Sequence, residues 1–319
     1  MKRSAFIGIC FVLAAGAAAA QAYPTKPIRI IVPFPPGGPS DMQARLVGPK
    51  LTQAWGPPTV IDNRGGASGL IGGELAAKAE PDGHTLILMT AGNAVQPSLY
   101  PQMPYDLVRD FAFVTPITSG PGIVVVNPSL PIRSVAELIA YAHARPGKVF
   151  FASAGSGAPS HLAVELFKVM TQTDIVRVPY KGMAPAINDV IGGQLQLSIP
   201  TMPGGLPLAK AGKLRALAVT GAQRSPAAPE LSTVAEAGVP GYQSANWYGF
   251  AAPAKTPRAI VIKLNREIAR IMATTDVRDR LLAVGMEPIS STPEQFTEFV
   301  KAEIGKWAKV VKSAGIKPD

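Results

Sequence analysis

Residues 28–41 read IRIIVPFPPGGPSD, and the order of residue types in this stretch decides the fold class. The first five residues are mostly β-branched and apolar, which is typical of a strand in a sheet. Two glycines then permit a tight turn, and Pro39 suits the first position of a helix. A strand, a glycine-rich turn and a helix in succession predict the start of an α/β unit with a parallel sheet.

The same alternation of strands and helices continues along the chain. Met42, Leu46 and Leu51 are expected to form the buried side of the first helix. The pattern restarts in the second half, so the sequence predicts two α/β units, joined by extended segments near 111–127 and 240–252. Further strands are predicted at 59–62, 85–89, 149–153, 175–178, 195–199 and 214–220, and capping boxes open helices at 134 and 292.

The overall composition is that of a folded protein with a large core. The chain has 319 residues, of which 47% are hydrophobic and 16% charged, which excludes intrinsic disorder and suffices for two domains. Its formal net charge is +10, but Lys and Arg are scattered singly rather than clustered. A solvated basic surface is therefore expected, and no nucleic-acid partner.

The first 22 residues have the pattern of a secretory signal peptide. A basic start precedes an apolar segment, and Ala20-Gln21-Ala22 fits the cleavage consensus. Cleavage after Ala22 would remove Cys10, the only cysteine, so no disulfide or Cys-ligated metal is expected in the mature chain. No later apolar run approaches the length of a membrane span, so the mature protein is expected to be soluble and exported.

The turn at residues 33–41 is the first candidate site. Gly37 and Gly38 permit close approach of a ligand to the backbone, and the free N–H groups at the start of the following helix attract anions. Asp41 has two possible roles, either a contact within a pocket or a first-turn acid that satisfies its own helix end. Phe34 has no apolar stripe to join and is expected to line the pocket.

A second turn of the same kind lies at residues 153–161, SAGSGAPSH. Glycines and small hydroxyls again precede a proline that would begin a helix. The segment approximates the dinucleotide-binding fingerprint, but Ser160 stands at its last position and no acid follows the next strand, so no nucleotide cofactor is expected. Two such turns, one in each unit, would present two helix N-termini to one small carboxylate.

Catalytic arrangements are sparse. His161 and Glu165 share a helix face without a third ligand, so no metal site is expected. Ser160 would point about 100° away from His161 on a helix, which excludes a Ser–His pair. His84 and His143 are expected to be packing or surface residues. The common hydrolase, zinc-protease and P-loop motifs are missing from the sequence, which favours a binding protein over an enzyme.

Several motifs, in the right order, resemble one family across nearly the whole mature chain. They include YPTKPIRIIVPFPPGGPSD at 23–41, IDNRGGASGLIGGELAAKAEPDGHTL at 61–86, SAGSGAPSHLAVELF at 153–167, VPYKGMAPAI at 178–187 and NWYGFAAP at 246–253. The sequence is thus similar to the Bordetella uptake gene (Bug) family, the periplasmic solute-binding proteins of tripartite tricarboxylate transporters. The resemblance implies a type II-like Venus-flytrap fold, in which two lobes, each a mixed sheet flanked by helices, close on a small organic anion.

The resemblance also implies where the lobes and the ligand site lie. Lobe I is expected at 23–118 plus 245–319 and lobe II at 119–244. The ligand carboxylate would be held largely by backbone N–H groups, small hydroxyls and bridging water. Carried over residue by residue, the ligand-binding positions are Phe34, Gly37, Gly38 and Asp41 in lobe I, Ser153, Gly155, Ser156, Gly157 and Ser160 in lobe II, and Asn93, Tyr180, Thr201 and Trp247 around the rest of the cleft.

Three parts of the sequence depart from the family pattern. Gly65 stands where members commonly have proline, and Met183 stands where they commonly have glycine. The segment 195–200, LQLSIP, lacks the acids that are usual there. Losing those acids disfavours an amino acid with its ammonium group and favours a simpler carboxylate.

The resemblance finally implies partners. A monomeric receptor without a cofactor or a metal would deliver its ligand to the large and small membrane permease subunits of the transporter. Two alternatives stay open: a receptor that signals through a two-component sensor kinase, and an exported hydrolase that uses the region 153–161.

Overall fold

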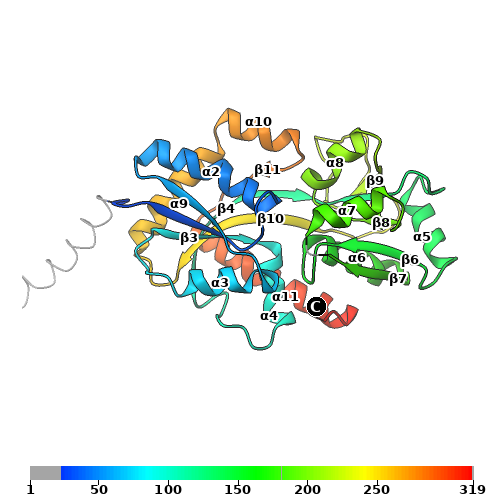
Figure 1. The fold of residues 1–319 in the computed structure, drawn as a ribbon, viewed down its shortest axis with the longest axis horizontal. Helices are drawn as coiled ribbons and strands as arrows, with labels where there is room; N and C mark the ends of the chain where they lie inside the picture. Colours follow the sequence, from blue (N-terminus) through cyan, green and yellow to red (C-terminus); the bar gives the residue numbers. More distant parts are fainter. Residues whose placement is uncertain (1–22, 181, 318–319) are drawn as a thin grey trace, which may run out of the picture.

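The computed structural model describes residues 23–180 and 182–317 of the chain. The predicted signal peptide, its cleavage site after Ala22 and Cys10 therefore lie outside the described residues. The described chain forms two mixed β-sheets, each flanked by helices, which follow one another along the long axis of the molecule (Figure 1). This confirms the α/β prediction. The half built on the six-stranded sheet is called lobe I, and the half built on the five-stranded sheet is called lobe II.

Lobe I has a sheet with the strand order β11-β4-β10-β3-β1-β2. β1 runs parallel to β2 and β3, whereas β10 lies antiparallel between β3 and β4. The sheet is thus completed by a strand that returns from the far end of the chain. The strands are β1 (Ile28–Val32), β2 (Thr59–Asn63), β3 (Thr85–Thr90), β4 (Phe111–Pro121), β10 (Ala245–Pro253) and β11 (Glu287–Pro288).

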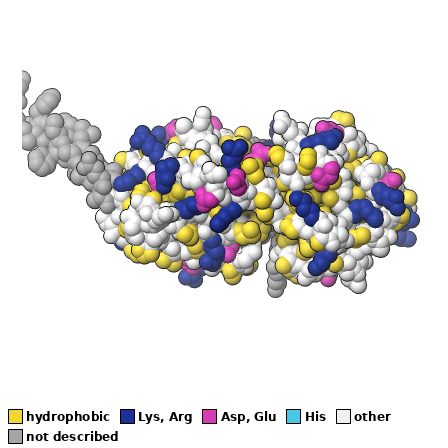
Figure 2. Space-filling model, turned by 90° about the horizontal axis from the view of Figure 1, so that it is seen from above, with side chains coloured by type: hydrophobic (Ala, Val, Ile, Leu, Met, Phe, Trp, Pro, Cys, Tyr) yellow, Lys and Arg dark blue, Asp and Glu magenta, His cyan; other side chains and the backbone are white. Residues whose placement is uncertain are grey.

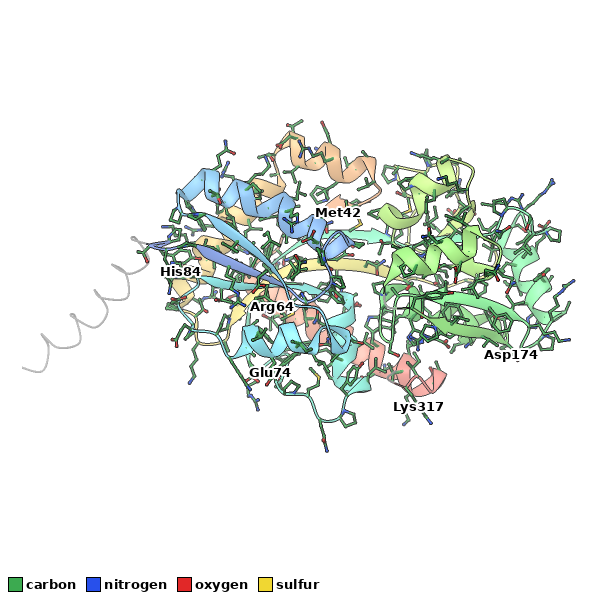
Figure 3. The ribbon with its side chains drawn as sticks, viewed as in Figure 1. Met42, Arg64, Glu74, His84, Asp174 and Lys317 are labelled. Carbon is green, nitrogen blue, oxygen red and sulfur yellow. The ribbon has the colours of Figure 1, made fainter. Side chains whose placement is uncertain are left out.

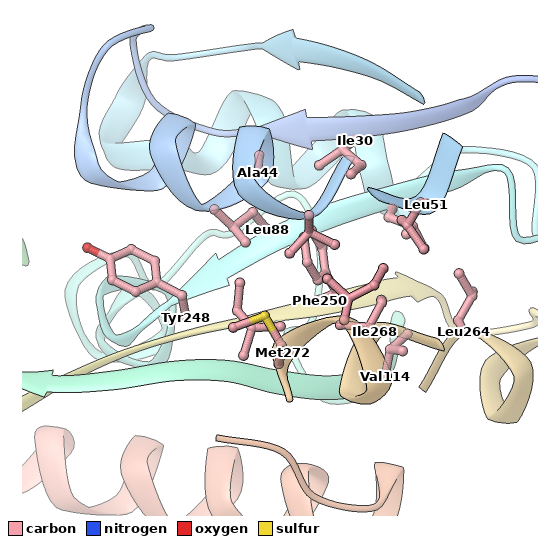
Figure 4. Close-up of a cluster of buried hydrophobic side chains, with 14 of the residues drawn as sticks. Ile30, Ala44, Leu51, Leu88, Val114, Tyr248, Phe250, Leu264, Ile268 and Met272 are labelled. Atoms are coloured by element: carbon pink, nitrogen blue, oxygen red, sulfur yellow. The ribbon is translucent and has the colours of Figure 1, made fainter. Parts of the chain in front are cut away.

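Helices cover both faces of this sheet (Figure 1). On one face, Ile30, Leu88 and Phe250 of the strands pack against Leu264 and Ile268 of α9, with α2 on the same side (Figure 4). On the other face, side chains of α4 and α11 form a second buried cluster with the strands. The helices are α2 (Pro39–Trp55), α3 (Leu70–Ala77), α4 (Ala91–Leu99), α9 (Arg258–Met272), α10 (Thr275–Ala283) and α11 (Pro293–Ala314), and a 3-10 turn, η1 (Ala67–Gly69), precedes α3.

The buried side of α2 differs from the prediction. Met42 is 51% exposed and Leu46 is only partly buried, so the expectation that Met42 faces the core was wrong. Ala44, Val47 and Leu51 face the sheet instead, at spacings of three and four residues. The pattern was ambiguous because both faces of the N-terminal part of α2 carry apolar residues. The small side chain of Ala44 lets the Ala44 face, rather than the Met42 face, lie close to the strands.

Lobe II repeats the plan of lobe I with five strands in the order β7-β6-β8-β5-β9. β6 is parallel to β7 and β8, and β5 lies antiparallel between β8 and β9. Nowhere in residues 23–180 and 182–317 is a helix both long enough and apolar enough to cross a membrane. The elements are β5 (Ile123–Val126), α5 (Val135–His143), β6 (Val149–Ser153), α6 (Pro159–Thr171), β7 (Ile175–Pro179), α7 (Met183–Ile191), β8 (Leu197–Ser198), α8 (Met202–Lys210) and β9 (Arg215–Val219).

The two lobes are joined by two short crossings. The last ladder pair of lobe I joins Pro121 to Ala245. The next residues along the chain, Gly122 and Ser244, are both bonded to the backbone of Thr220 at the end of β9, at 3.0 Å and 2.8 Å. Pro121 and Ala245 belong to the lobe I sheet, whereas their neighbours Gly122 and Ser244 are bonded to lobe II. Each crossing between the lobes is therefore one peptide unit long. The division at 23–118 plus 245–319 and 119–244 stays a prediction.

Candidate ligand-binding site

The first glycine-rich turn forms the uncapped start of α2. Gly38 is the N-cap and has no side-chain cap, and Gly37 has φ +78°, which favours glycine. Asp41 Oδ2 accepts hydrogen bonds from Gly37 N at 3.0 Å and from Arg45 Nε at 2.8 Å. Of the two roles left open for Asp41, this geometry matches the acid that satisfies its own helix end. Within the described residues, the N–H groups of Gly38, Ser40 and Asp41 have no protein acceptor.

The Asp41 carboxylate stays charged in this position. Its residue is only 4% exposed, and burial alone would raise the pKa of the carboxyl group. The hydrogen bonds from Arg45 and Gly37 outweigh burial and hold the pKa below its ordinary value. Arg45 therefore balances the charge of Asp41, and the turn offers a ligand its backbone rather than this carboxylate.

The second glycine-rich turn forms the uncapped start of α6. Gly155 and Gly157 have φ +116° and +71°, and Pro159 occupies the first helical turn, as predicted. Ser160 Oγ accepts from Ala154 N at 3.1 Å, and His161 Nδ1 accepts from Gly157 N at 3.2 Å. Side chains of the first helical turn thus hold the loop that precedes them.

Arg177 supports the second turn from the neighbouring strand β7, and the sequence analysis missed it. Its Nε donates to Ser153 Oγ at 2.8 Å and its Nη1 to Ser156 Oγ at 3.1 Å. Ser156 Oγ also donates to the carbonyl of Lys317 at 3.2 Å, on the segment after α11 that reaches lobe II (Figure 3). Both serines are buried and bonded to protein groups. The sequence did contain a signal for Arg177, because it is a charged residue within an apolar strand, next to a predicted site.

Helix α4 connects the two turns. A Cβ atom at Gly92, in its first turn, would lie 3.3 Å from Gly157 O of the second glycine-rich turn. Gln96 lies four residues further along α4, next to Gly69, which in turn lies next to the first glycine-rich turn. A Cβ atom at Gly69 would lie 3.4 Å from both Gln96 Nε2 and Pro33 Cβ. The first turns of α2 and α6 both lie at the boundary between the lobes (Figure 1). The structure therefore brings the two predicted turns to neighbouring positions along one face of α4.

The surface at this boundary is partly apolar. Met42, in the first turn of α2, lies on the side of lobe I that faces lobe II (Figure 3). Figure 2 shows hydrophobic side chains gathered where the lobes meet, whereas Lys and Arg are scattered over both lobes. Phe34 is partly buried in the first turn, and its carbonyl accepts from Asn63 Nδ2 at 3.1 Å.

Three other predicted residues have structural partners of their own. Asn93 is buried and caps α4 together with Thr90, whose N–H it accepts at 2.8 Å. Thr201 is the N-cap of α8 and is bridged to Gly122. The Tyr180 hydroxyl donates to Asp189, and this bond is the first cause that raises the pKa of Tyr180 to about 12.

Trp247 points into the core of lobe I. Its side chain is 2% exposed, packs edge-on against Phe296 and Phe299 at ring-centroid distances of 5.6 Å, and donates to Glu303 Oε2 at 3.2 Å. Trp307 donates to the same oxygen at 3.0 Å. The structure therefore does not bring the Trp247 ring together with the two turns.

A metal site would need several ligating side chains close together among the described residues. None of these residues forms a group of three or more His, Cys, Asp or Glu suited to a metal ion. His161 Nε2 lies 3.7 Å from Glu165 Oε1, and Glu165 is paired with Lys168. Two surface hollows of about 370 and 510 Å³ lie elsewhere, the first around Arg215 in lobe II and the second beside Tyr105 in lobe I.

Comparisons with known proteins agree with the family resemblance of the sequence. The family described as "Tripartite tricarboxylate transporter family receptor" matches residues 43–316. Protein BugT of Bordetella pertussis is 40% identical over 318 residues, covering 98% of this chain and 97% of BugT. The structure of R. palustris Rpa4515 with adipate has 43% identity and a TM-score of 0.88, covering 93% of this chain and all of Rpa4515. The periplasmic binding protein BugD has 33% identity and a TM-score of 0.86 over the same shares.

Proposed function

Since this chain belongs to the tripartite tricarboxylate transporter receptor family, we propose that it captures one small organic carboxylate between its two lobes. The predicted family and the two-lobed binding-protein fold are confirmed by the match over residues 43–316 and by the structural neighbours. The chain is a solute-binding receptor of the periplasmic type. Its relative Rpa4515, which shares 43% of its residues, was solved with adipate, a carboxylate.

One observation carries the proposal: the two glycine-rich turns that lead into uncapped helix starts lie beside the same face of one helix, α4. Each start offers backbone N–H groups and the positive end of a helix dipole to an anion. A hydrogen bond to a charged group contributes roughly 1.5–3 kcal/mol, and micromolar capture requires about 8 kcal/mol. A few such bonds from the two turns therefore suffice for a small carboxylate.

We assign the predicted ligand residues other than Trp247, which lies in the core of lobe I, to three roles. The backbone and ring of the turns would contact the ligand, through Phe34, Gly37, Gly38, Gly155 and Gly157. The side chains of Asp41, Ser153, Ser156 and Ser160 would hold those turns in shape, since each is bonded to protein groups. Asn93, Tyr180 and Thr201 would support the surrounding elements.

The ligand would be a carboxylate without an ammonium group. Asp41 is the acid within the first turn, and its charge is balanced by Arg45, so it would not attract an ammonium group. The segment 195–200 also lacks acids. We further propose that the receptor is a monomer, that it is cleaved after Ala22, and that it delivers its ligand to the large and small permease subunits.

Calorimetric titration of the mature chain, residues 23–319, tests this function. The panel holds mono-, di- and tricarboxylates, including adipate, together with glutamate as the amino-acid counterpart. We expect micromolar binding of at least one simple carboxylate and weaker binding of glutamate. Silence across the panel, with the fold intact by circular dichroism, would contradict the proposal.

A blocking variant locates the site. Gly38→Val is suited to this purpose because a Cβ at Gly38 would lie 3.6 Å from Pro35 O, an ordinary contact that the fold tolerates. The branched side chain would cover the free N–H groups of α2. Binding should fall at least tenfold while the melting temperature stays within a few degrees. Unchanged binding would place the ligand elsewhere.

A further inference from the structure

A strained turn lies beside the first glycine-rich turn. Four residues in succession, 66–69, have positive φ angles of 130°, 45°, 52° and 92°. Ala67 and Ser68 are not glycines, and L-residues avoid this region because Cβ crowds the backbone. Such conformations persist only where the surroundings fix them, and they concentrate at ligand-binding sites. The turn therefore needs an anchor outside itself.

The anchor is Gln96 of α4. It is 2% exposed, and its Nε2 donates to the carbonyl oxygen of Ser68 at 2.8 Å. Its Oε1 accepts from the Tyr105 hydroxyl at 2.8 Å and from Asn93 Nδ2 at 3.4 Å. Because a carbonyl oxygen can only accept, the bond to Ser68 fixes which end of the amide faces the turn. A second bond, from the Tyr100 hydroxyl to Ser68 Oγ at 3.0 Å, holds the same residue.

The anchored turn packs directly against the first glycine-rich turn. A Cβ at Gly69 would lie 3.4 Å from Pro33 Cβ, and a Cβ at Gly65 would lie 3.2 Å from Pro35 Cδ. The backbone at Gly65 and Gly69 therefore lies next to residues 33–38, and a shift of the strained turn would change its packing against them. One helical turn earlier on the same face, α4 touches Gly157 through Gly92. One helix thus sets the distance between the two turns, and Gln96 is its polar link to the strained turn 66–69.

We propose that Gln96 is a positioning residue, which holds the strained turn 66–69 against residues 33–38 and thereby sets the affinity of the lobe I side for its carboxylate. This inference rests on the proposed function. Gln96 does not need to touch the ligand, since it acts through Ser68. The same role explains why a buried, uncharged amide with three bonded partners lies between two candidate binding turns.

The variant Gln96→Glu separates this role from general packing. An ionised carboxylate keeps an acceptor for Tyr105 and Asn93 but faces the Ser68 carbonyl with an oxygen, which repels it. A protonated carboxyl group can donate to Ser68 again, and burial favours protonation. The variant should therefore bind adipate about tenfold more weakly at about pH 8.5, and should approach wild-type affinity at about pH 5.

Tyr105→Phe is the matched control. It removes a bond to the same Gln96 oxygen but leaves the bond to Ser68, so its adipate affinity should stay within about twofold at both pH values. Amide hydrogen exchange of the ligand-free proteins gives a second readout. Exchange in residues 64–72 should be about tenfold faster in Gln96→Glu at the higher pH and unchanged in the control. Should Gln96→Glu not fold, Gln96→Met carries the same prediction without the recovery at low pH.

Three results would overturn the inference: unchanged exchange in the turn, faster exchange with unchanged affinity, or equal losses in the variant and the control. If the wild-type protein binds none of the carboxylates in the panel, the proposed function fails instead. The exchange measurement needs no ligand and still decides whether Gln96 orders the turn.

Discussion

The side-chain oxygen of Thr220 accepts a hydrogen bond from the backbone N–H of Gly122 at 2.6 Å. The same hydroxyl donates to the carbonyl of Ser244 at 2.5 Å. Gly122 follows the last lobe I pair of one crossing, and Ser244 precedes the first lobe I pair of the other. One fully buried hydroxyl therefore joins the two crossings between the lobes.

Replacing this hydroxyl should destabilise the protein. Thr220→Val keeps the shape of the side chain but leaves a buried N–H and a buried C=O without their partner, which costs about 1–3 kcal/mol. Thr220→Ser keeps the hydroxyl and should cost less. Urea unfolding of both variants measures the difference, and equal stability of Thr220→Val and wild type would contradict a stabilising role of the hydroxyl.

Asp41 should act mainly on the stability of α2. Asp41→Ala removes the acceptor of Gly37 N, and loss of a comparable N-terminal cap costs about 1 kcal/mol. Asp41→Asn keeps an acceptor oxygen and should cost less than Asp41→Ala. Thermal unfolding checks the order of the two variants. A stable Asp41→Ala protein with lost carboxylate binding would instead support direct ligand contact.

Two glycine-to-alanine variants should have opposite effects. A Cβ at Gly249 would lie 2.4 Å from Phe296 Cζ, so Gly249→Ala overpacks the core of lobe I and should cost about 1–3 kcal/mol or more. Gly305 lies within α11 with no atom within 4 Å of its Cβ position. Gly305→Ala should therefore stabilise the helix by about 0.5–1 kcal/mol. Chemical denaturation of both variants tests the contrast.

Lowering the pH should reduce the free energy of unfolding, in part through protonation of Asp110. Hydrogen bonds from Arg109 and from the backbone of Asp106 lower the pKa of Asp110 to about 2. A carboxyl group whose pKa is depressed in the folded state stabilises that state above its unfolded pKa, near 3.9, and this contribution is lost as the pH falls to about 2. The free energy of unfolding of Asp110→Asn should thus depend less on pH between about 4 and 2. An identical pH profile in the variant would rule out this contribution.

The backbone plan was predictable because each strand carries its own signal. The apolar runs at 28–32 and 149–153 are strands with those bounds, and Pro39 and Pro159 begin the helices that follow. The two candidate turns followed from the same residues. Local residue types sufficed here, since a glycine-rich turn before a proline places the helix start whatever lies around it.

Side-chain direction was less predictable because it depends on distant partners. Trp247 lies in a strand that is buried on both faces, so alternation could not tell whether its ring faced the cleft or the core. Glu303, more than fifty residues later, decides this by accepting the indole N–H. Gln96 was likewise overlooked, because its role depends on Ser68 and Tyr105, which the spacing of residues in α4 does not reveal.

The insertion of β10 between β3 and β4 also constrains the order in which the chain can fold. Lobe II is one continuous segment, and its strands are complete once residue 219 has been synthesised. The central position of the lobe I sheet stays vacant until residues 245–253 arrive. β3 and β4 therefore keep unpaired inner edges until β10 is added, and such edges are open to mispairing.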